Sequence, residues 1–455
     1  MEVGSSRIIM TPPRGLPLAG YFNPRPNEGV LDDLYVRCVL FRQGRTVSGV
    51  VSLDACMISE EFVEKVLSVL AKAGFRYGRS LIVAATHTHT APYITTIFGK
   101  APDPRYLSGL VAKIVEAVLE AERNLAPATL RIGKVKDNPM AFSRRYWMKG
   151  GGVTTNPGIK NPGIVKPEGT VDREIGILSV EQGGRLTALI TNIVNHTDTV
   201  GENWVSADWP GRLERCIQNS VGHDPLVMTL IGCAGNVNHL DVHSDEYQGY
   251  AYAHARQLGE CYAERVLARL GGLKKLEVDR LAVVNRAISI PYRRITSAQR
   301  DQALSVLAKT TRVEGGGDLT SEGLATGEGA VARFFAEQLL EYSEQCAGKS
   351  RRFRLVSLGF GTEFVLNSLP GEPFTEIGLA IKRRSSFKHT WPVALAMGAC
   401  GYVPLAECFE RGGYETLPVV GGAPREDTAD RLIKAAAENL DRVWTKNTCQ
   451  RKTYN

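Results

Sequence analysis

Short apolar strands and amphipathic helices alternate through most of this chain of 455 residues. Residues 34–41 and 46–54 predict two strands joined by a tight turn, which is typical of a hairpin. The stretch 59–75 predicts a helix, because its apolar residues recur at spacings of three and four. Residues 80–86 then predict a buried strand. This alternation favours an α/β protein with a mixed β-sheet core and flanking helices.

The same pattern continues to the end of the chain. We expect further helices near 103–125, 246–270, 297–309, 329–346, 373–385 and 426–444, and further strands near 129–135, 173–181, 186–196, 225–232, 279–292, 353–359, 362–368 and 392–398. Two segments interrupt it. Residues 137–171 carry Pro and Gly without periodicity, which predicts a long irregular loop, either functional or disordered. Residues 310–328 are Gly-rich and are the best candidate for a sub-domain boundary.

Composition and charge exclude several classes of protein. The 55 basic and 48 acidic residues give a net charge of +7, a mild excess without a recognisable DNA or RNA module, so we expect no nucleic-acid partner. No apolar run reaches the roughly 18 residues of a membrane-spanning helix, and the N-terminus lacks the apolar region of a signal peptide. We therefore expect no stable membrane anchor. Nine cysteines without a CxxC pair favour reduced thiols and a cytoplasmic location.

Two histidines follow directly after the buried strand at 80–86, in the sequence THTHTAP. In an extended chain, side chains two positions apart share a face, so His87 and His89 can converge beyond the strand end. Open α/β sheets bind ligands at the C-terminal ends of their strands, and histidine is the commonest metal ligand. The motif predicts an active site or metal site there. The alternative is a surface turn with two polar histidines.

A third histidine, His196, ends another apolar strand in the sequence VNHTDT. Three histidines at the ends of two strands would supply a catalytic zinc site with ligands to spare. The alternative is a histidine that ends its strand and hydrogen-bonds to its neighbours.

Three later segments also follow strands. The glycine turn GCAGNVNH suits close approach of the backbone to a ligand, and its last residue, His239, is a candidate polar contact. In LPGEPF, the carboxylate of Glu372 could point out of the sheet end, or it is a first-turn glutamate favoured by the helix dipole. Tyr402 and Tyr414 lie near the last strand, which is ordinary for tyrosines taken by themselves.

Together these segments resemble the catalytic domain of the neutral/alkaline non-lysosomal ceramidase family. The matching pieces are THTHTAP, VNHTDT, GCAGNVNH, LPGEPFT and GYVPLAECFERGGYE, in the family's order from residue 86 to residue 415. The segments SRRYWMKGG and GTVDREIGIL resemble the family's arginine segment and the strand after it. The resemblance implies one ceramidase-like catalytic domain over 1–455 and a zinc-dependent amidohydrolase.

The resemblance also implies a role for each matched residue. The zinc ligands would be His87, His196, Glu372 and Tyr402. His89 would be the general acid/base, and Tyr414 would polarise the scissile carbonyl or its oxyanion. Arg145, with Arg144 as the alternative, would match the active-site arginine. These roles suit the chemistry, because zinc accepts nitrogen and oxygen ligands while a histidine can carry a proton to a leaving amine.

The chain also departs from the family. Ceramidases carry a further C-terminal immunoglobulin-like domain and are secreted or membrane-associated, so we expect a shorter, intracellular relative. Gly-Asn-Val-Asn stands where the family has a Gly-Asp pattern. The polar segments that flank the site favour a water-soluble small molecule over long-chain ceramide; they are Thr197-Asp198-Thr199, Glu202-Asn203, Asn236, Asn238 and Arg144-Arg145.

The sequence thus predicts a hydrolase that uses a zinc-activated water to cleave an amide bond of a small polar or N-acyl substrate. The alternatives are a zinc esterase or lactonase, a true ceramidase, and a binding relative without catalysis. We expect the segment 137–171 to border the site, with Arg145 offering positive charge to an anionic substrate.

Overall fold

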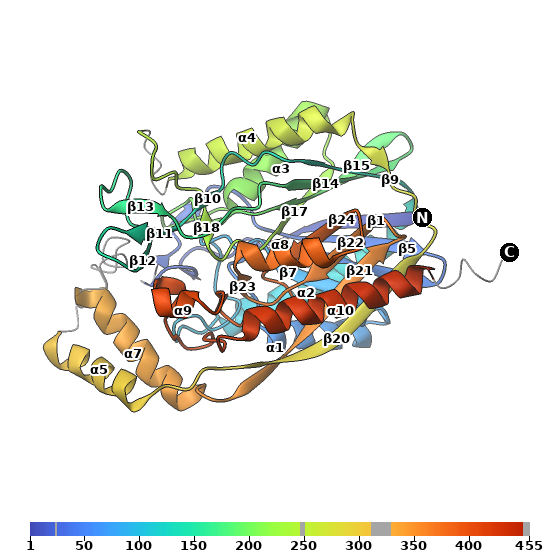
Figure 1. Cartoon of the computed structure of the whole chain (residues 1–455). Helices are drawn as coiled ribbons and strands as arrows, with labels where there is room; N and C mark the ends of the chain where they lie inside the picture. Colours follow the sequence, from blue (N-terminus) through green and yellow to red (C-terminus); the bar gives the residue numbers. More distant parts are fainter. Residues whose placement is uncertain (23–24, 246–250, 311–328, 449–455) are drawn as a thin grey trace.

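The computed structural model describes residues 1–22, 25–245, 251–310 and 329–448 (Figure 1). The N-terminus lies at one end of the molecule, and helices α5 (Ser297–Lys309) and α7 (Gly329–Gln345) lie at the other (Figure 1). The sub-domain boundary predicted near 310–328 falls, beyond residue 310, outside the described residues. The prediction of one catalytic domain over 1–455 stays a prediction.

The first sheet has the strand order β7-β6-β5-β1-β8. Its strands are β1 (Glu2–Ile9), β5 (Tyr35–Gln43), β6 (Thr46–Leu53), β7 (Leu81–Ala85) and β8 (Ala126–Pro127). Strands β5 and β6 form the predicted hairpin, and β7 pairs parallel to β6. Helix α2 (Pro104–Arg123) packs on β1 and β5, and α1 (Glu60–Lys72) packs on α2. The five residues of β7 are all buried, which explains why its sequence is apolar throughout.

The second sheet has the order β17-β15-β14-β9-β19. Its strands are β9 (Thr129–Val135), β14 (Ile175–Gln182), β15 (Arg185–Ile193), β17 (Leu226–Ile231) and β19 (Lys274–Lys275). Helices α3 (Asp208–Val221) and α4 (Tyr252–Leu270) pack against each other and cover this sheet (Figure 1). The edge strand β17 lies against β1, β6 and β7, so the two sheets share one apolar core.

The third sheet has the order β20-β21-β22-β24. Its strands are β20 (Leu281–Pro291), β21 (Ser350–Phe360), β22 (Phe364–Ser368) and β24 (His389–Val393), and α8 (Thr375–Arg384) and α10 (Thr428–Thr448) pack on it. The buried indole of Trp391 lies over Gly176 of β14, where a Cβ would come within 2.4 Å of the ring. Only glycine leaves room for this contact between the second and third sheets.

Parallel and antiparallel pairs occur together in all three large sheets, which confirms the predicted mixed β-sheet core with flanking helices. Among the described residues, none of the helices has the length and apolar character needed to cross a membrane.

The prediction of an irregular loop over 137–171 is wrong. The segment contains β10 (Phe142–Ser143), β11 (Arg145–Met148), β12 (Val153–Thr155) and β13 (Ile164–Pro167). Strands β12, β11 and β13 form a small sheet, and β10 pairs with β18 (Val237–Asn238) in the glycine turn. Strands of two to four residues are too short to show a sequence period, which is why the pattern missed them.

A buried ion pair joins the first sheet to α3. Arg37 of β5 donates from Nη1 to Asp54 at 2.7 Å and from Nε to Glu214 of α3 at 3.1 Å. The three side chains are almost completely buried. Arg37 is therefore the shared partner of two buried carboxylates, and Glu214 has a second partner in the partly exposed Arg7, at 2.9 Å.

We expect Arg37→Met to lower the free energy of unfolding by about 3–5 kcal/mol, because it removes the ion-pair partner of the buried Asp54 and one of the two partners of Glu214. Arg42→Met is the matched control in the same strand, since Arg42 and its partner Glu2 are both more than a third exposed. Urea unfolding of both variants measures the difference. Equal shifts would show that the buried network adds nothing special to stability.

Candidate metal centre

His87 leaves strand β7 in an unusual backbone conformation. Its φ is 69°, a left-handed value that residues other than glycine rarely adopt. Its Nδ1 lies 2.7 Å from the carbonyl oxygen of Cys56, so Nδ1 carries the hydrogen and Nε2 of the neutral ring presents its lone pair. The turn directs this Nε2 to within 3.2 Å of Oε2 of Glu372. The prediction of an extended chain at this point is wrong, although His87 and His89 still converge.

His196 follows the neighbouring sheet's strand β15 and is held in the same way. Its Nδ1 lies 2.8 Å from the carbonyl oxygen of Val237, so its Nε2 also presents a lone pair when the ring is neutral. That Nε2 lies 3.4 Å from Oε2 of Glu372. The indole of Trp209 donates to the backbone carbonyl of His196 at 2.7 Å and fixes the chain where it leaves the strand.

Glu372 comes from the third sheet, after strand β22. It begins β23 (Glu372–Pro373), which pairs parallel to β25 (Tyr402–Val403), so Glu372 and Tyr402 are direct register partners. The glycine turn serves this arrangement, because a Cβ on Gly235 would lie 2.3 Å from the Glu372 carbonyl oxygen. The close approach expected at that turn is therefore to the backbone beside a site residue.

Three lone-pair atoms meet at this point, and they fit a divalent metal ion. His87, His196 and Glu372 each offer one atom, and these atoms lie within 4.8 Å of one another. All three residues are buried. Oε2 of Glu372 is buried and accepts no hydrogen bond from the described residues. Two imidazole nitrogens and a carboxylate oxygen are a donor set typical of catalytic metal sites with an open position.

The electrostatics of the cluster favour positive charge. Burial opposes ionisation of Glu372, yet the positive charge of His87 and the neighbouring imidazole of His196 hold the pKa of Glu372 well below its usual range. Burial likewise disfavours a charged His87, but the Glu372 carboxylate raises the pKa of His87 well above its ordinary value. The pair thus attracts a cation, which is a proton when no metal is bound.

His89 lies beside the three lone-pair atoms. Its Nε2 is 3.3 Å from Nε2 of His87. Burial, reinforced by the charge of His87, moves the pKa of His89 well below its ordinary value, so this imidazole is neutral near pH 7. Gly20 packs against the ring: its φ is 99°, and a Cβ there would lie 2.4 Å from Cγ of His89.

Arg144, and not Arg145, faces the centre. Nη1 of Arg144 lies 3.2 Å from Nε2 of His196, and its guanidinium carbon lies 4.9 Å from the centre of the Tyr402 ring. The Tyr402 and Tyr414 rings are 5.3 Å apart, and burial raises the pKa of both phenols, which keeps them protonated. Arg145 points away and pairs with Glu168 and Glu415.

The placement of Arg145 corrects the expectation that this arginine belongs to the site. Its side chain is fully buried in ion pairs, so it offers no positive charge to a substrate. The physical reason is that adjacent residues of an extended chain face opposite directions, and only one of the two arginines can face the metal centre. The segment 137–171 does border the site, as expected, but through Arg144.

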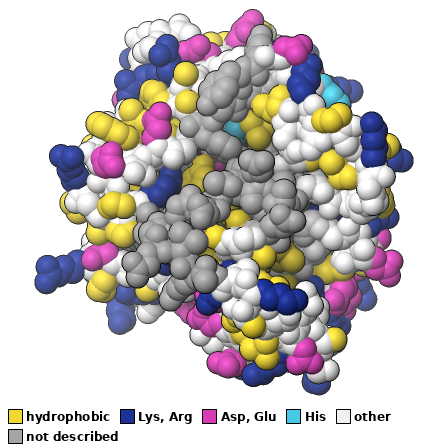
Figure 2. Space-filling model, turned by 90° about the vertical axis from the view of Figure 1, so that its left-hand side faces the viewer, with side chains coloured by type: hydrophobic (Ala, Val, Ile, Leu, Met, Phe, Trp, Pro, Cys, Tyr) yellow, Lys and Arg dark blue, Asp and Glu magenta, His cyan; other side chains and the backbone are white. Residues whose placement is uncertain are grey.

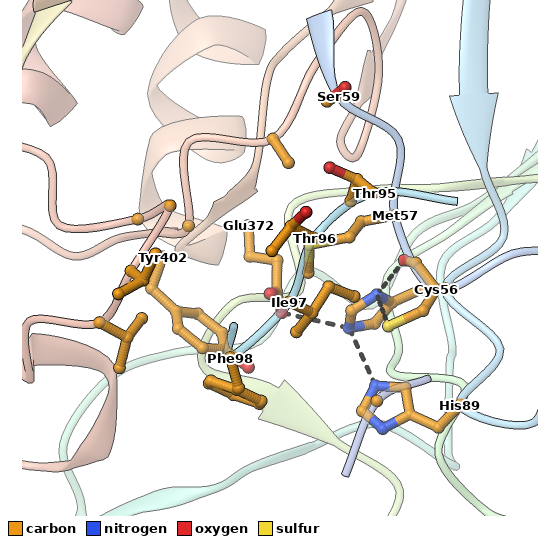
Figure 3. A pocket seen from close by; sticks show the side chains of 18 of the residues that line it. Cys56, Met57, Ser59, His89, Thr95, Thr96, Ile97, Phe98, Glu372 and Tyr402 are labelled. Atoms are coloured by element: carbon orange, nitrogen blue, oxygen red, sulfur yellow. Dashed lines mark hydrogen bonds and ion pairs between the residues drawn. The ribbon is translucent and has the colours of Figure 1, made fainter. Parts of the chain in front are cut away.

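A pocket opens on this cluster (Figure 3). Its volume, including space open to solvent, is about 830 Å³. The wall contains Met57, Ile97, Phe98, Ala399, Leu417, Val419 and Val420, together with the polar Ser59, Thr95 and Thr96. Phe98 contacts Phe22 and Phe334 of α7, with ring centres 5.2 and 5.4 Å away. Figure 2 views the end of the molecule that carries α5 and α7, where hydrophobic side chains lie between charged ones.

The polar flanking residues do not form the pocket wall. Thr197 donates to the carbonyl of Thr86, and Thr199 donates to the carboxylate of Asp208. The amide of Asn236 donates to Glu376, and that of Asn238 donates to Asn156. These four groups are buried and hydrogen-bonded inside the protein, so they do not favour a water-soluble substrate.

The sequence reading missed two residues of the site. Cys56 follows the end of β6 and lines the pocket, with its sulfur 3.9 Å from Nδ1 of His87. Glu415 directly follows Tyr414 and binds Arg144. Both lie where a strand end or a matched motif could have drawn attention to them. His239 lies outside the lone-pair cluster, in contact with Asp198 and His254.

Comparison with known proteins establishes the class of fold. No family model and no curated protein sequence matches this chain. Two solved structures with the same architecture are ceramidases. Neutral ceramidase from Pseudomonas aeruginosa superimposes with a TM-score of 0.71 and 16% identity, covering 98% of this chain and 74% of that one. A ceramidase complexed with C2 superimposes with a TM-score of 0.70 and 16% identity, covering 99% of this chain and 75% of that one. The chain has the fold of the neutral ceramidases, and this identity shows the fold alone.

We expect His87→Ala and His196→Ala each to lose bound metal, because each removes one of the three converging lone-pair atoms. Metal analysis of the purified variants measures this. The control is His223→Ala, since His223 contacts the carbonyl of Leu186 at the opposite end of the sheet and should leave metal content unchanged. Full occupancy in either site variant would remove that residue from the ligand set.

We expect Gly20→Ala to retain metal but to lower turnover at least tenfold, because the added methyl displaces the His89 ring and strains a backbone with positive φ. Gly15→Ala is the control, since Gly15 also has positive φ but nothing within 4 Å of its Cβ position. Steady-state kinetics and metal analysis of both variants give the comparison. Equal turnover in the two variants would show that Gly20 does not position His89.

Proposed function

We propose that this chain is a zinc-dependent hydrolase that cleaves the amide bond of an N-acyl small molecule. The observation that carries the proposal is the convergence of two imidazole nitrogens and one carboxylate oxygen, with His89 beside them, at the base of a mainly apolar pocket. The two similar structures are ceramidases, and a ceramidase is an amide hydrolase, which supports the same reaction class.

His87, His196 and Glu372 would hold the zinc ion, and Tyr402 is the candidate for a fourth ligand because it pairs with Glu372 across β23 and β25. A zinc ion in such a site supplies Lewis acidity and lowers the pKa of water to about 7. The hydrogen bonds from the two Nδ1 atoms to carbonyl oxygens orient the imidazoles and increase their basicity.

His89 is the proton carrier in this proposal. Its depressed pKa leaves the imidazole neutral near pH 7, so the unprotonated ring nitrogen can accept a proton from the attacking water. The same atom then donates the proton to the leaving nitrogen, which prevents expulsion of an amide anion. Tyr414 and Arg144 are the candidates for stabilising negative charge on the carbonyl oxygen, because phenol and guanidinium groups donate hydrogen bonds to oxyanions.

The pocket wall favours an apolar acyl group. Ile97, Phe98, Leu417 and Val419 offer no hydrogen bonds from their side chains to a polar chain, whereas each methylene buried against them contributes about 0.8 kcal/mol. We therefore favour the N-acyl alternative over a small polar substrate. We also propose one catalytic domain, a cytoplasmic location and no nucleic-acid partner, as the sequence predicts.

The same activated water would attack an ester or lactone, so the reaction class needs a direct test. Zinc-loaded protein should be assayed on N-acyl amino acids, matched esters, lactones and ceramide in detergent. We expect amide cleavage, and we expect His89→Ala to keep its zinc and lose about 10²–10⁴-fold in turnover. A drop of only a few-fold would remove His89 from proton transfer. Faster cleavage of esters or of ceramide would replace the proposed substrate by that class.

We expect kcat/KM to rise with acyl length in a series of N-acyl glycines from about 4 to about 12 carbons, because the acyl group of the substrate would lie on the apolar wall. Phe98→Ser should flatten this rise while leaving the shortest substrate nearly unchanged. The control is Leu304→Ser, because Leu304 lies on the exposed face of α5. Phe75→Ser is unsuitable as a control because the Phe75 side chain is fully buried. A flat series in the wild-type protein would contradict the apolar subsite.

A further inference from the structure

We propose that Glu415 is a positioning residue that holds the Arg144 guanidinium against the metal centre. The inference rests on the proposed function, because it assigns Arg144 to the reacting site. Glu415 lies in the short helix η2 (Tyr414–Thr416), directly after Tyr414. Its side chain is completely buried. Nothing about its type marks it as functional, and its role comes from the contacts alone.

The Glu415 carboxylate joins the two neighbouring arginines. Oε1 accepts from Nε of Arg144 at 2.8 Å, and Oε2 accepts from Nη1 of Arg145 at 2.5 Å. The hydroxyl of Thr155 also donates to Oε2, at 2.8 Å. Three donors from two elements therefore fix the carboxylate, and the carboxylate fixes the orientation of the planar Arg144 fork.

The rest of the Arg144 guanidinium touches the metal centre. Nη1 lies 3.2 Å from Nε2 of His196, and Nη2 donates to the carbonyl oxygen of Gly235 at 2.7 Å. The guanidinium carbon lies 4.9 Å from the centre of the Tyr402 ring. Nε and Nη2 thus have oxygen partners, and Nη1 faces the His196 nitrogen that would bind the metal, so Arg144 holds a fixed positive charge beside two candidate ligands. It is poorly placed to bind a substrate carboxylate in a fork.

Arg145 and Glu168 complete the charge balance on the far side. Arg145 pairs with Glu168 and with the second oxygen of Glu415, and Glu168 is also buried. Gly413 makes room for this packing, since a Cβ there would lie 2.2 Å from Nη1 of Arg145. Arg144, Glu415, Arg145 and Glu168 alternate through the network, and Arg411 joins its far end at 3.6 Å from Glu168. Glu415 is the member that links this network to Arg144 beside the metal centre.

The matched variants are Glu415→Gln and Glu168→Gln. Each replaces one buried carboxylate of the same network by an amide of the same shape, but only Glu415 contacts Arg144. With zinc bound, we expect Glu415→Gln to lower kcat at least tenfold with KM within about threefold, because an oxyanion-side donor that is lost altogether costs about 10²–10³-fold. We expect Glu168→Gln to keep kcat within about threefold of wild type.

A second readout does not need turnover. In the cobalt-substituted proteins, the visible absorption bands report the geometry of the ligands, and we expect them to shift in Glu415→Gln and not in Glu168→Gln. Should the wild-type protein cleave no amide, the proposed function fails while the cobalt spectra still test the positioning role. Unchanged spectra and unchanged kcat in Glu415→Gln would overturn the inference, as would equal effects in the two variants.

Glu415→Asp covers the case in which the glutamine variant does not fold. It keeps the charge but shortens the side chain by one methylene, so it cannot hold both arginines at their present positions. We expect a smaller loss of kcat and a smaller spectral shift in the same direction. Wild-type kcat together with a wild-type spectrum in this variant would show that the position of Arg144 does not depend on Glu415.

Discussion

The arrangement of the whole site depends on one oxygen atom, Oε2 of Glu372, which faces two imidazole nitrogens. When His87 and His196 are neutral, their Nδ1 hydrogens bind carbonyl oxygens, so three lone pairs point at one another. Such a cluster is repulsive unless positive charge lies within it. The three atoms therefore form a candidate cation site, because the hydrogens of both neutral imidazoles are already bound to carbonyl oxygens.

Each of the three converging residues comes from a different sheet. His87 follows β7 of the first sheet, His196 follows β15 of the second, and Glu372 follows β22 of the third. The site thus lies where three strand ends meet, and its geometry depends on how the sheets pack. Contacts between sheets, such as Trp391 on Gly176, therefore help to set the distances inside the site.

Strands that are buried along their length could be found from the sequence, because apolar runs of five or more residues leave a clear pattern, as in β7. His87, His196 and Glu372 could be proposed because each follows such a strand or its turn. The choice between Arg144 and Arg145 could not be made, since it depends on which side of a short strand faces the centre. The assigned chemical roles, and zinc itself, stay predictions.

The sequence by itself determined the mixed α/β architecture and the polar residues that leave its strands, because period and strand length are local properties. Tertiary structure alone decided what those residues meet. It turned Thr199 and Asn238 inward, and it assembled an apolar pocket wall from Met57, Phe98 and Val419, which lie far apart in the chain. Contacts between distant segments depend on how sheets pack, and no local pattern in a single sequence records that packing.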